Sequence, residues 1–159
     1  MPASVFRNHD PDAVLVSRAD PADPLASYSK HAFHLDGEAW PSVEHYYQAS
    51  KFDDPVIRDE VRNAPHPDTA AKIARRRRRQ VRKGWDDLKE VYMTRATYTK
   101  CRTHTDVANA LIATGEKTII ETSQYDYYWG CGRDTRGRNV YGRVLTNVRT
   151  KLREEPLKP

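Results

Sequence analysis

The chain has 159 residues, enough for a single domain to bury a hydrophobic core without disulfides or a structural metal. Its net charge of +5 and pI of about 9.2 favour anionic partners such as phosphates, nucleotides or nucleic acid. No stretch approaches the roughly 18 apolar residues of a membrane span, and the first residues lack a signal-peptide pattern. Cys101 and Cys131 show no metal-binding or disulfide spacing. We therefore expect a cytoplasmic protein with reduced thiols, no membrane partner, no metal and no cofactor.

Residues 1–24 are rich in turns because three Asp-Pro pairs interrupt them, and Val14, Leu15 and Val16 predict one short strand there. Residues 31–35 alternate between apolar and polar positions, which predicts a second strand. Asp-Gly at 36–37 is a strong turn signal. Pro41 and Ser42 then mark a helix start, so we expect a strand, a turn and a helix in succession.

The stretch 40–52 combines aromatic bulk with ionisable groups in one short helical span. A 3.6-residue period places Glu44, Gln48 and Lys51 on one side, with Tyr47 at its edge. The opposite sides carry the apolar residues Val43, Tyr46, Ala49 and Phe52. Two interpretations are open: the polar side is a pocket wall that handles protons, or it is a solvent-exposed stripe with ordinary Glu–Lys spacing.

The middle of the chain predicts three helices. Asp54 and Pro55 start a short helix that stops before the prolines at 65 and 67, and Asp68 caps the next one. That helix ends in the arginine run 75–79, which is either a solvated surface or a source of one or two phosphate-binding side chains. Gly84 separates it from a longer helix beginning at about residue 86. Trp85, at the entry of that helix, is either a core residue or a ligand platform.

The last third begins with a helix over 107–114, capped by Thr105 or Asp106, and a strand over 117–121. Residues 123–139 form an aromatic, glycine-punctuated loop of a kind that usually lines a site. A final helix from about Val140 should dock on the core through regularly spaced apolar residues: Val144, Leu145, Val148 and Leu152.

Two motifs carry a resemblance to a known family. The first is W-P-S-V-E-H-Y-Y-Q-A-S-K-F at 40–52; the second is Y-Y-W-G-C-G at 127–132, followed by Gly137, Asn139 and Gly142. Trp85 and Lys89 match a segment between them. In order and spacing these motifs resemble the YbiA-like family, also called NADAR (NAD and ADP-ribose) domains. The resemblance implies a compact, mainly helical α+β single domain with a few short strands over residues 25–153, with 1–24 as a loop-rich segment and 154–159 as a tail.

The resemblance further implies an N-glycosidase, a hydrolase that breaks the bond between ribose and an amine. By position it places the catalytic residues at Glu44, Asp126 and Lys51. The substrate-binding residues that we expect are Tyr47, Gln48, Arg75, Trp85, Trp129, Gly130 and Asn139. Glu44 and Asp126 can share proton delivery and charge stabilisation, or Lys51 can form a Schiff base with the ring-opened sugar, and both routes are open.

Three functions are compatible with the resemblance. The first is hydrolysis of ribosylamino or phosphoribosylamino pyrimidines, intermediates of riboflavin biosynthesis, with release of ribose 5-phosphate. The second is removal of ADP-ribose from guanine in nucleic acid, for which the arginine run is an argument. The third is binding of ADP-ribose or NAD without turnover. At 25–28 the chain has L-A-S-Y where family members commonly have L-S-N-F, so a substrate contact supplied there is altered.

Overall fold

The structure is a computed structural model that describes residues 10–155. Most of the residues that lie in regular elements are helical and each strand has three residues, which confirms the mainly helical α+β domain. In chain order the elements are β1 (Val14–Val16), β2 (Phe33–Leu35), β3 (Glu38–Trp40), α2 (Val43–Ala49), α3 (Pro55–Arg62), α4 (Pro67–Arg76), the 3-10 turn η1 (Arg78–Gln80), α5 (Trp85–Thr103), α6 (Thr105–Ile112), β4 (Ile119–Glu121) and α7 (Val140–Glu154).

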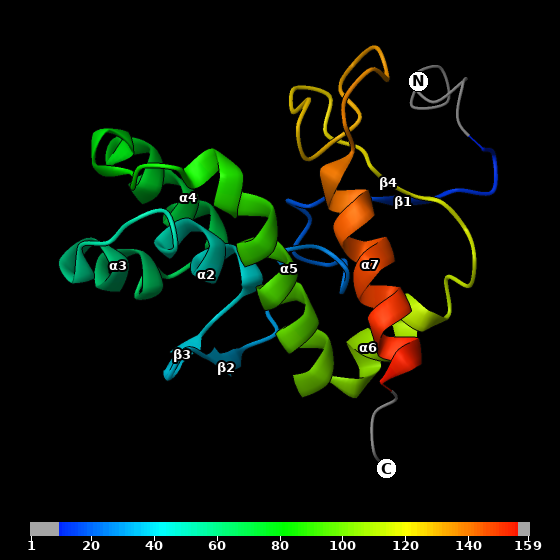
Figure 1. Ribbon diagram of the computed structural model, residues 1–159, viewed down its shortest axis with the longest axis horizontal. Helices are drawn as coiled ribbons and strands as arrows, with labels where there is room; N and C mark the ends of the chain where they lie inside the picture. Colours follow the sequence, from blue (N-terminus) through cyan, green and yellow to red (C-terminus); the bar gives the residue numbers. More distant parts are fainter. Residues whose placement is uncertain (1–9, 156–159) are drawn as a thin grey trace.

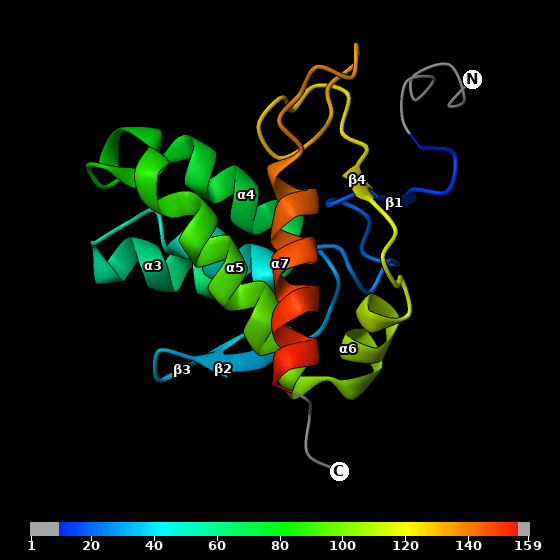
Figure 2. The same cartoon turned by 45° about the vertical axis from the view of Figure 1, so that its right-hand side comes forward.

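The two long helices α5 and α7 pack side by side at the centre of the molecule (Figure 1). α2, α3 and α4 lie on one side of α5, whereas β1 and β4 lie beyond α7, an arrangement that is also clear after rotation (Figure 2). The loop between β4 and α7 extends past the N-terminal end of α7. The largest fully buried side chains, among them Trp40, Tyr46 and Tyr141, belong to one core that these helices share.

β1 and β4 pair in parallel, with Val14 opposite Ile119 and Val16 opposite Glu121. In a parallel pair the carboxyl ends of both strands meet at the same edge. The residue that follows β1 by two positions, Arg18, is therefore delivered next to the end of β4, where its backbone N–H donates to Glu121 Oε2 at 2.6 Å. These residues take part in the fold although they precede residue 25.

β2 and β3 form an antiparallel hairpin in which Phe33 pairs with Trp40. Asp36 and Gly37 both have positive φ, 55° and 79°, as a two-residue primed turn requires. The turn signal is confirmed, but the expected passage from turn directly to helix was wrong. A third strand precedes α2 because the primed turn sends the chain back along β2.

α2 begins where the sequence indicates: Ser42 is its N-cap, and Ser42 Oγ accepts from the His45 N–H at 3.1 Å. All seven residues of the helix are buried. The interpretation of its polar side as a solvent-exposed stripe was therefore wrong, since Glu44 is 0% exposed. α3, α4 and α5 pack against α2, and Arg18 and Ser27 cover its polar side at Glu44.

The other helices follow the predicted order with small shifts at their starts. α3 starts at Asp54 and Pro55 as expected, with Asp54 as its N-cap. α4 starts at Pro67 with His66 at the N-cap, so Asp68 lies in the first turn instead of capping. α6 likewise has His104 at its N-cap, one residue before the expected cap. In both cases the favourable acid sits within the first turn, where it faces the positive end of the helix dipole.

Candidate active site

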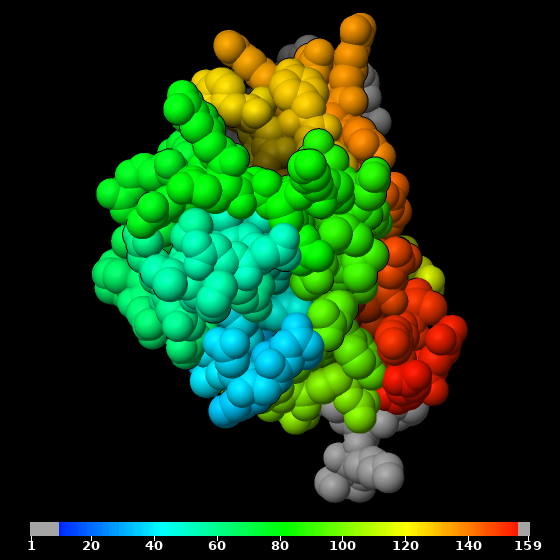
Figure 3. Space-filling view, turned by 60° about the vertical axis from the view of Figure 1, so that its left-hand side comes forward, coloured from blue at the N-terminus to red at the C-terminus, as the bar shows by residue number. Residues whose placement is uncertain are grey.

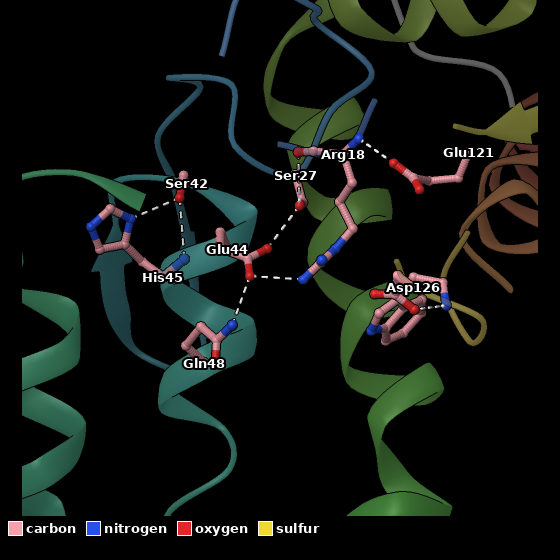
Figure 4. A network of polar contacts seen from close by, with 9 residues as sticks. Arg18, Ser27, Ser42, Glu44, His45, Gln48, Glu121 and Asp126 are labelled. Carbon is pink, nitrogen blue, oxygen red and sulfur yellow. Dashed lines mark hydrogen bonds and ion pairs between the residues drawn. The ribbon is translucent and has the colours of Figure 1, made fainter. Parts of the chain in front are cut away.

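Glu44 is the centre of a buried polar network (Figure 4). Its Oε1 accepts from Arg18 Nη2 at 2.8 Å and from Gln48 Nε2 at 2.7 Å, and its Oε2 accepts from Ser27 Oγ at 2.8 Å. Gln48 reaches it because the two residues are four apart on α2. Three donors from three different parts of the chain thus compensate the burial of this carboxylate.

Arg18, which the sequence interpretation missed, is the charged partner of Glu44. Burial by itself would lower the pKa of Arg18, but the carboxylate of Glu44 opposes this and the pKa is raised above its usual value. The guanidinium carbon lies 5.7 Å from the ring centroids of both Tyr47 and Trp129, within cation–π range. The only signal in the sequence is a lone basic residue just after a predicted strand.

An aromatic wall adjoins this ion pair. Tyr47 lies between Trp85 and Trp129, with ring centroids 5.4 Å and 5.5 Å away. The three side chains are almost completely buried. Trp85 therefore belongs to the core and also to the wall, so the two interpretations of it are not exclusive. Burial raises the pKa of Tyr47, which keeps its phenol protonated.

Lys51 follows α2 and lies with its Nζ 5.3 Å from the centroid of the Tyr47 ring. Within residues 10–155 its amine makes no ion pair or side-chain hydrogen bond. Burial lowers the pKa of Lys51; the charge of Glu44 opposes this shift, and the cations Arg18, Lys89 and Arg75 add to it. The site therefore holds an amine with an increased neutral, nucleophilic fraction.

Asp126 enters from the loop between β4 and α7. Its Oδ1 accepts from the backbone N–H groups of Tyr128 and Trp129 at 3.0 and 2.8 Å, which fixes the carboxylate. Oδ2 has no partner in the described part of the chain. Asp126 lies across Arg18 from Glu44 (Figure 4), and its charge contributes to the raised pKa of Arg18. The structure thus gathers both predicted carboxylates around one arginine.

Asn139 and Gly130 shape the loop that carries Asp126. The Asn139 side-chain amide makes two hydrogen bonds to the backbone of β4: Oδ1 accepts from Glu121 N at 2.8 Å and Nδ2 donates to Ile119 O at 2.9 Å. The Asn139 N–H donates to the Gly130 carbonyl at 3.0 Å. The amide of Asn139 is therefore engaged in holding the loop, while contact of either residue with substrate stays a prediction.

Arg75 is exposed at the C-terminal end of α4, and its charge adds to the lowering of the pKa of Lys51. The space-filling view shows a recess between the green segment that contains α4 and α5 and the yellow and orange loop 122–139 (Figure 3). Ser27 and Glu121 are two further site residues that sequence reasoning missed. Ser27 occupies the altered L-A-S-Y segment and supports Glu44 rather than lining the recess, since it is 0% exposed.

The NADAR domain family model matches residues 5–153. The chain belongs to the NADAR domain family. It is 37% identical over 132 residues to an N-glycosidase of Nostoc punctiforme, covering 81% of this chain and 85% of that protein. It is 34% identical over 136 residues to N-glycosidase YbiA of Escherichia coli, covering 86% and 85%. The predicted enzyme class, a hydrolase of N-glycosyl bonds, is confirmed by these relatives.

The NMR structure of the E. coli protein YbiA has the same fold as this NADAR domain, with a TM-score of 0.81 and 32% identity over 100% of this chain and 97% of that one. A riboflavin biosynthesis protein of Vibrio vulnificus is 37% identical over 130 residues, which span 82% of this chain and 35% of that protein. No helix among residues 10–155 is long and apolar enough to cross a membrane. The cytoplasmic location stays a prediction.

Proposed function

We propose that this NADAR domain hydrolyses the N-glycosidic bond of a ribosylamino or phosphoribosylamino pyrimidine and releases ribose 5-phosphate. The observation that carries the proposal is the gathering of an unpaired amine, Lys51, and two carboxylates, Glu44 and Asp126, beside one aromatic wall. A flat pyrimidine can stack against such a wall, and the exposed guanidinium of Arg75 can bind the phosphate. The riboflavin biosynthesis name of the Vibrio relative supports this substrate class.

Glu44 serves as a buried anion and not as the proton donor. Its two oxygens are occupied by Arg18, Gln48 and Ser27, and its side chain is closed off from solvent. A fixed negative charge at this place stabilises the positive charge that develops on C1 of the sugar. The direct proton transfers fall to Asp126, which retains a free oxygen.

Lys51 acts as the nucleophile on the ring-opened substrate, in which C1 is double-bonded to a protonated nitrogen. Its neutral amine adds to C1, and Asp126 takes one proton from Nζ and gives it to the leaving nitrogen. The bond from C1 to that nitrogen then breaks, so the amine leaves with both of its hydrogens and C1 remains as a protonated imine on Lys51. Water adds to this imine and releases the sugar aldehyde and the free amine of Lys51. In the alternative direct route, Asp126 activates water against the closed ring.

Borohydride reduction during turnover tests the route. We expect a reduced sugar adduct on the peptide that contains Lys51, and neither adduct nor turnover in Lys51→Met, while Lys72→Met, an exposed lysine on α4, behaves as wild type. Asp126→Asn keeps the Oδ1 acceptor for the backbone N–H groups and should lose about 10²–10⁴-fold in kcat. Activity in Lys51→Met together with loss in Asp126→Asn would establish the direct route. Absence of ribose 5-phosphate release from wild type contradicts the proposed function.

A specific observation favours the second candidate, removal of ADP-ribose from nucleic acid. Five exposed cations near the recess, among residues 75–83, have no ion pair in the part of the chain that the structure describes: Arg75, Arg76, Arg78, Arg79 and Lys83. Arg77 is different, because it pairs with Glu60 at 2.8 Å. An unneutralised surface of this kind suits a polyphosphate chain. The remaining alternative is binding of ADP-ribose or NAD without turnover. Binding of these ligands with no turnover of either candidate substrate would favour it.

A further inference from the structure

A second buried amine lies on α5, outside the recess. The side chain of Lys100 is buried, with the residue 1% exposed, and its Nζ donates to Pro24 O at 2.7 Å, to Ala26 O at 3.0 Å and to Ser29 Oγ at 2.9 Å. An ammonium group has three donors, so all of them are used. Within residues 10–155 no carboxylate lies at ion-pair distance from it. All three hydrogen bonds of the Lys100 ammonium group therefore go to uncharged oxygens of a single segment, 24–29.

That segment contacts both members of the central ion pair of the site. Ser27 Oγ donates to Glu44 Oε2 at 2.8 Å, and the Ser27 carbonyl accepts from the Glu44 N–H at 3.0 Å. The Tyr28 N–H donates to the Arg18 carbonyl at 3.2 Å. Lys100 is thus one hydrogen-bonded segment away from the carboxylate that stabilises charge at C1.

We propose that protonated Lys100 is a positioning residue of this N-glycosidase: it holds segment 24–29 so that Ser27 keeps Glu44 in place, and loss of its proton slows turnover. The proposal rests on the proposed function, because its effect is exerted on that site. A neutral amine has two donors and one lone pair, so one of the three oxygens loses its donor on deprotonation. The segment is then held by one hydrogen bond fewer.

The charge of Lys100 is poised to change in an accessible pH range. Burial lowers its pKa to about 8, while neighbouring titratable groups oppose the shift: Cys101 on α5, Asp23 just before segment 24–29 and Asp106 on α6. Two histidines, His31 and His104, are also near this amine. The pKa of His31 is lowered, mainly by burial and next by the charges of Lys100 and His104. His31 also pairs with Asp106 at 3.7 Å.

The effect on turnover can be separated from unfolding. Because the folded pKa is lowered, the unfolded chain holds the proton more tightly between pH 8 and the usual value of 10.5. In this window the contribution of Lys100 to the free energy of unfolding increases with pH. A loss of rate there is therefore not the result of Lys100 destabilising the fold.

The test compares kcat against pH for wild type, Lys100→Arg and Lys30→Met, a control that removes an exposed lysine beside the same segment. We expect the wild-type kcat to fall severalfold within one pH unit above a midpoint near 8, with little change in KM, and the control to follow it. Arginine keeps its charge throughout this range, so in Lys100→Arg the alkaline fall should move up by more than one unit. A flat wild-type profile, or an unchanged midpoint in Lys100→Arg, would overturn the proposal.

Ser29→Ala covers the case in which Lys100→Arg does not fold. It removes one acceptor of the charged amine, so the midpoint must move to lower pH, and an unmoved midpoint counts against the proposal.

An NMR titration, which needs no turnover, tests the role of Lys100 separately from the proposed function. In the NMR spectrum of the whole protein, the Cε signal of Lys100 should titrate near pH 8 and the amide signals of Ser27 and Glu44 should shift with it. If Lys100 titrates and these amides do not respond, the positioning role is wrong. If no ribose 5-phosphate is released at any pH, the proposed function fails, and the NMR titration still decides the role of Lys100.

Discussion

The Arg18–Glu44 pair places two opposite charges almost entirely out of water. The side chain of Arg18 is 14% exposed and that of Glu44 is 0% exposed. Taking such charges from water is costly, and their attraction compensates only while both are present. Gln48 and Ser27 add further hydrogen bonds to the carboxylate. Removal of one partner should therefore harm the fold more than removal of both.

We expect Glu44→Gln to lower the free energy of unfolding by about 3–5 kcal/mol, because it leaves the Arg18 charge buried without its partner. Adding Arg18→Met should restore part of that loss. Urea unfolding of the four variants of this cycle measures both values. Glu116→Gln, which removes a pair with the same 2.8 Å distance but an 89% exposed carboxylate, should cost at most about 1 kcal/mol. Losses that simply add in the double variant would show that the two charges do not depend on each other.

Three catalytic candidates, Glu44, Lys51 and Asp126, were predicted from their motifs, and the structure brings them to one site. Arg18 and Ser27 were not predicted. Arg18 lies in a segment without a matching motif, and nothing local distinguishes it from the other arginines of a basic chain. Arg18 reaches the site because β1 pairs with β4. These strands lie far apart in the sequence, so no local pattern predicts their pairing. The catalytic roles of Glu44, Lys51 and Asp126 stay predictions until turnover is measured.

At the level of elements, the loop 122–139 depends on close contacts between backbone segments. A Cβ on Gly130 would lie 2.5 Å from Glu121 Oε1 and 2.9 Å from the Ser123 carbonyl. A Cβ on Gly137 would collide with the carbonyls of Gly130 and Cys131, and the Gly137 N–H donates to the Cys131 carbonyl at 2.7 Å. The glycines of the family motif are thus needed for the fold of the loop that presents Asp126 and Trp129.

Gly137→Ala should displace this loop, because the atoms it meets are backbone atoms that cannot rotate away. We expect kcat to fall at least about tenfold, with a loss of about 1–3 kcal/mol in the free energy of unfolding. Steady-state kinetics and urea unfolding provide the two values. Arg136→Ala, whose side chain is 86% exposed on the same loop, should match wild type in both. Full activity of Gly137→Ala would show that the loop accommodates a side chain there.

At the level of the whole molecule, the net charge of +5 is unevenly placed. The unpaired cations of residues 75–83 gather at α4 and η1 on one border of the recess, whereas Arg143 and Arg153 elsewhere are neutralised by Glu90 and Glu116. Unpaired cations beside a site attract anionic substrates in a salt-dependent manner. The length of the anion decides how many of these cations it contacts.

Replacing Arg76, Arg78 and Arg79 together by serine separates the two candidate substrates. If ADP-ribosylated nucleic acid is the substrate, the slope of log affinity against log salt should become less steep by about 0.7–0.9 per lost phosphate contact. Turnover of a phosphoribosylamino pyrimidine should be unchanged, because Arg75 remains for its single phosphate. Binding titrations at several salt concentrations measure the slope, with Lys151→Ser on α7 as the control. An unchanged slope in the triple variant would exclude this surface as a nucleic-acid contact.

The sequence by itself determined the family, because the order and spacing of its motifs can be read along the chain. It also determined the order of the helices, the start of α2 at Ser42 and of α3 at Asp54, and the Asp36–Gly37 turn, because these features depend on residues that are close in sequence. Only the tertiary structure decided that the polar side of α2 is buried and that Arg18 is the partner of Glu44. The first follows from α3, α4 and α5 packing against α2 and from Arg18 and Ser27 covering its polar side. The second follows from the parallel pairing of β1 with β4, which brings Arg18 next to Glu121, 103 positions away, and whose register is set by packing against the rest of the chain.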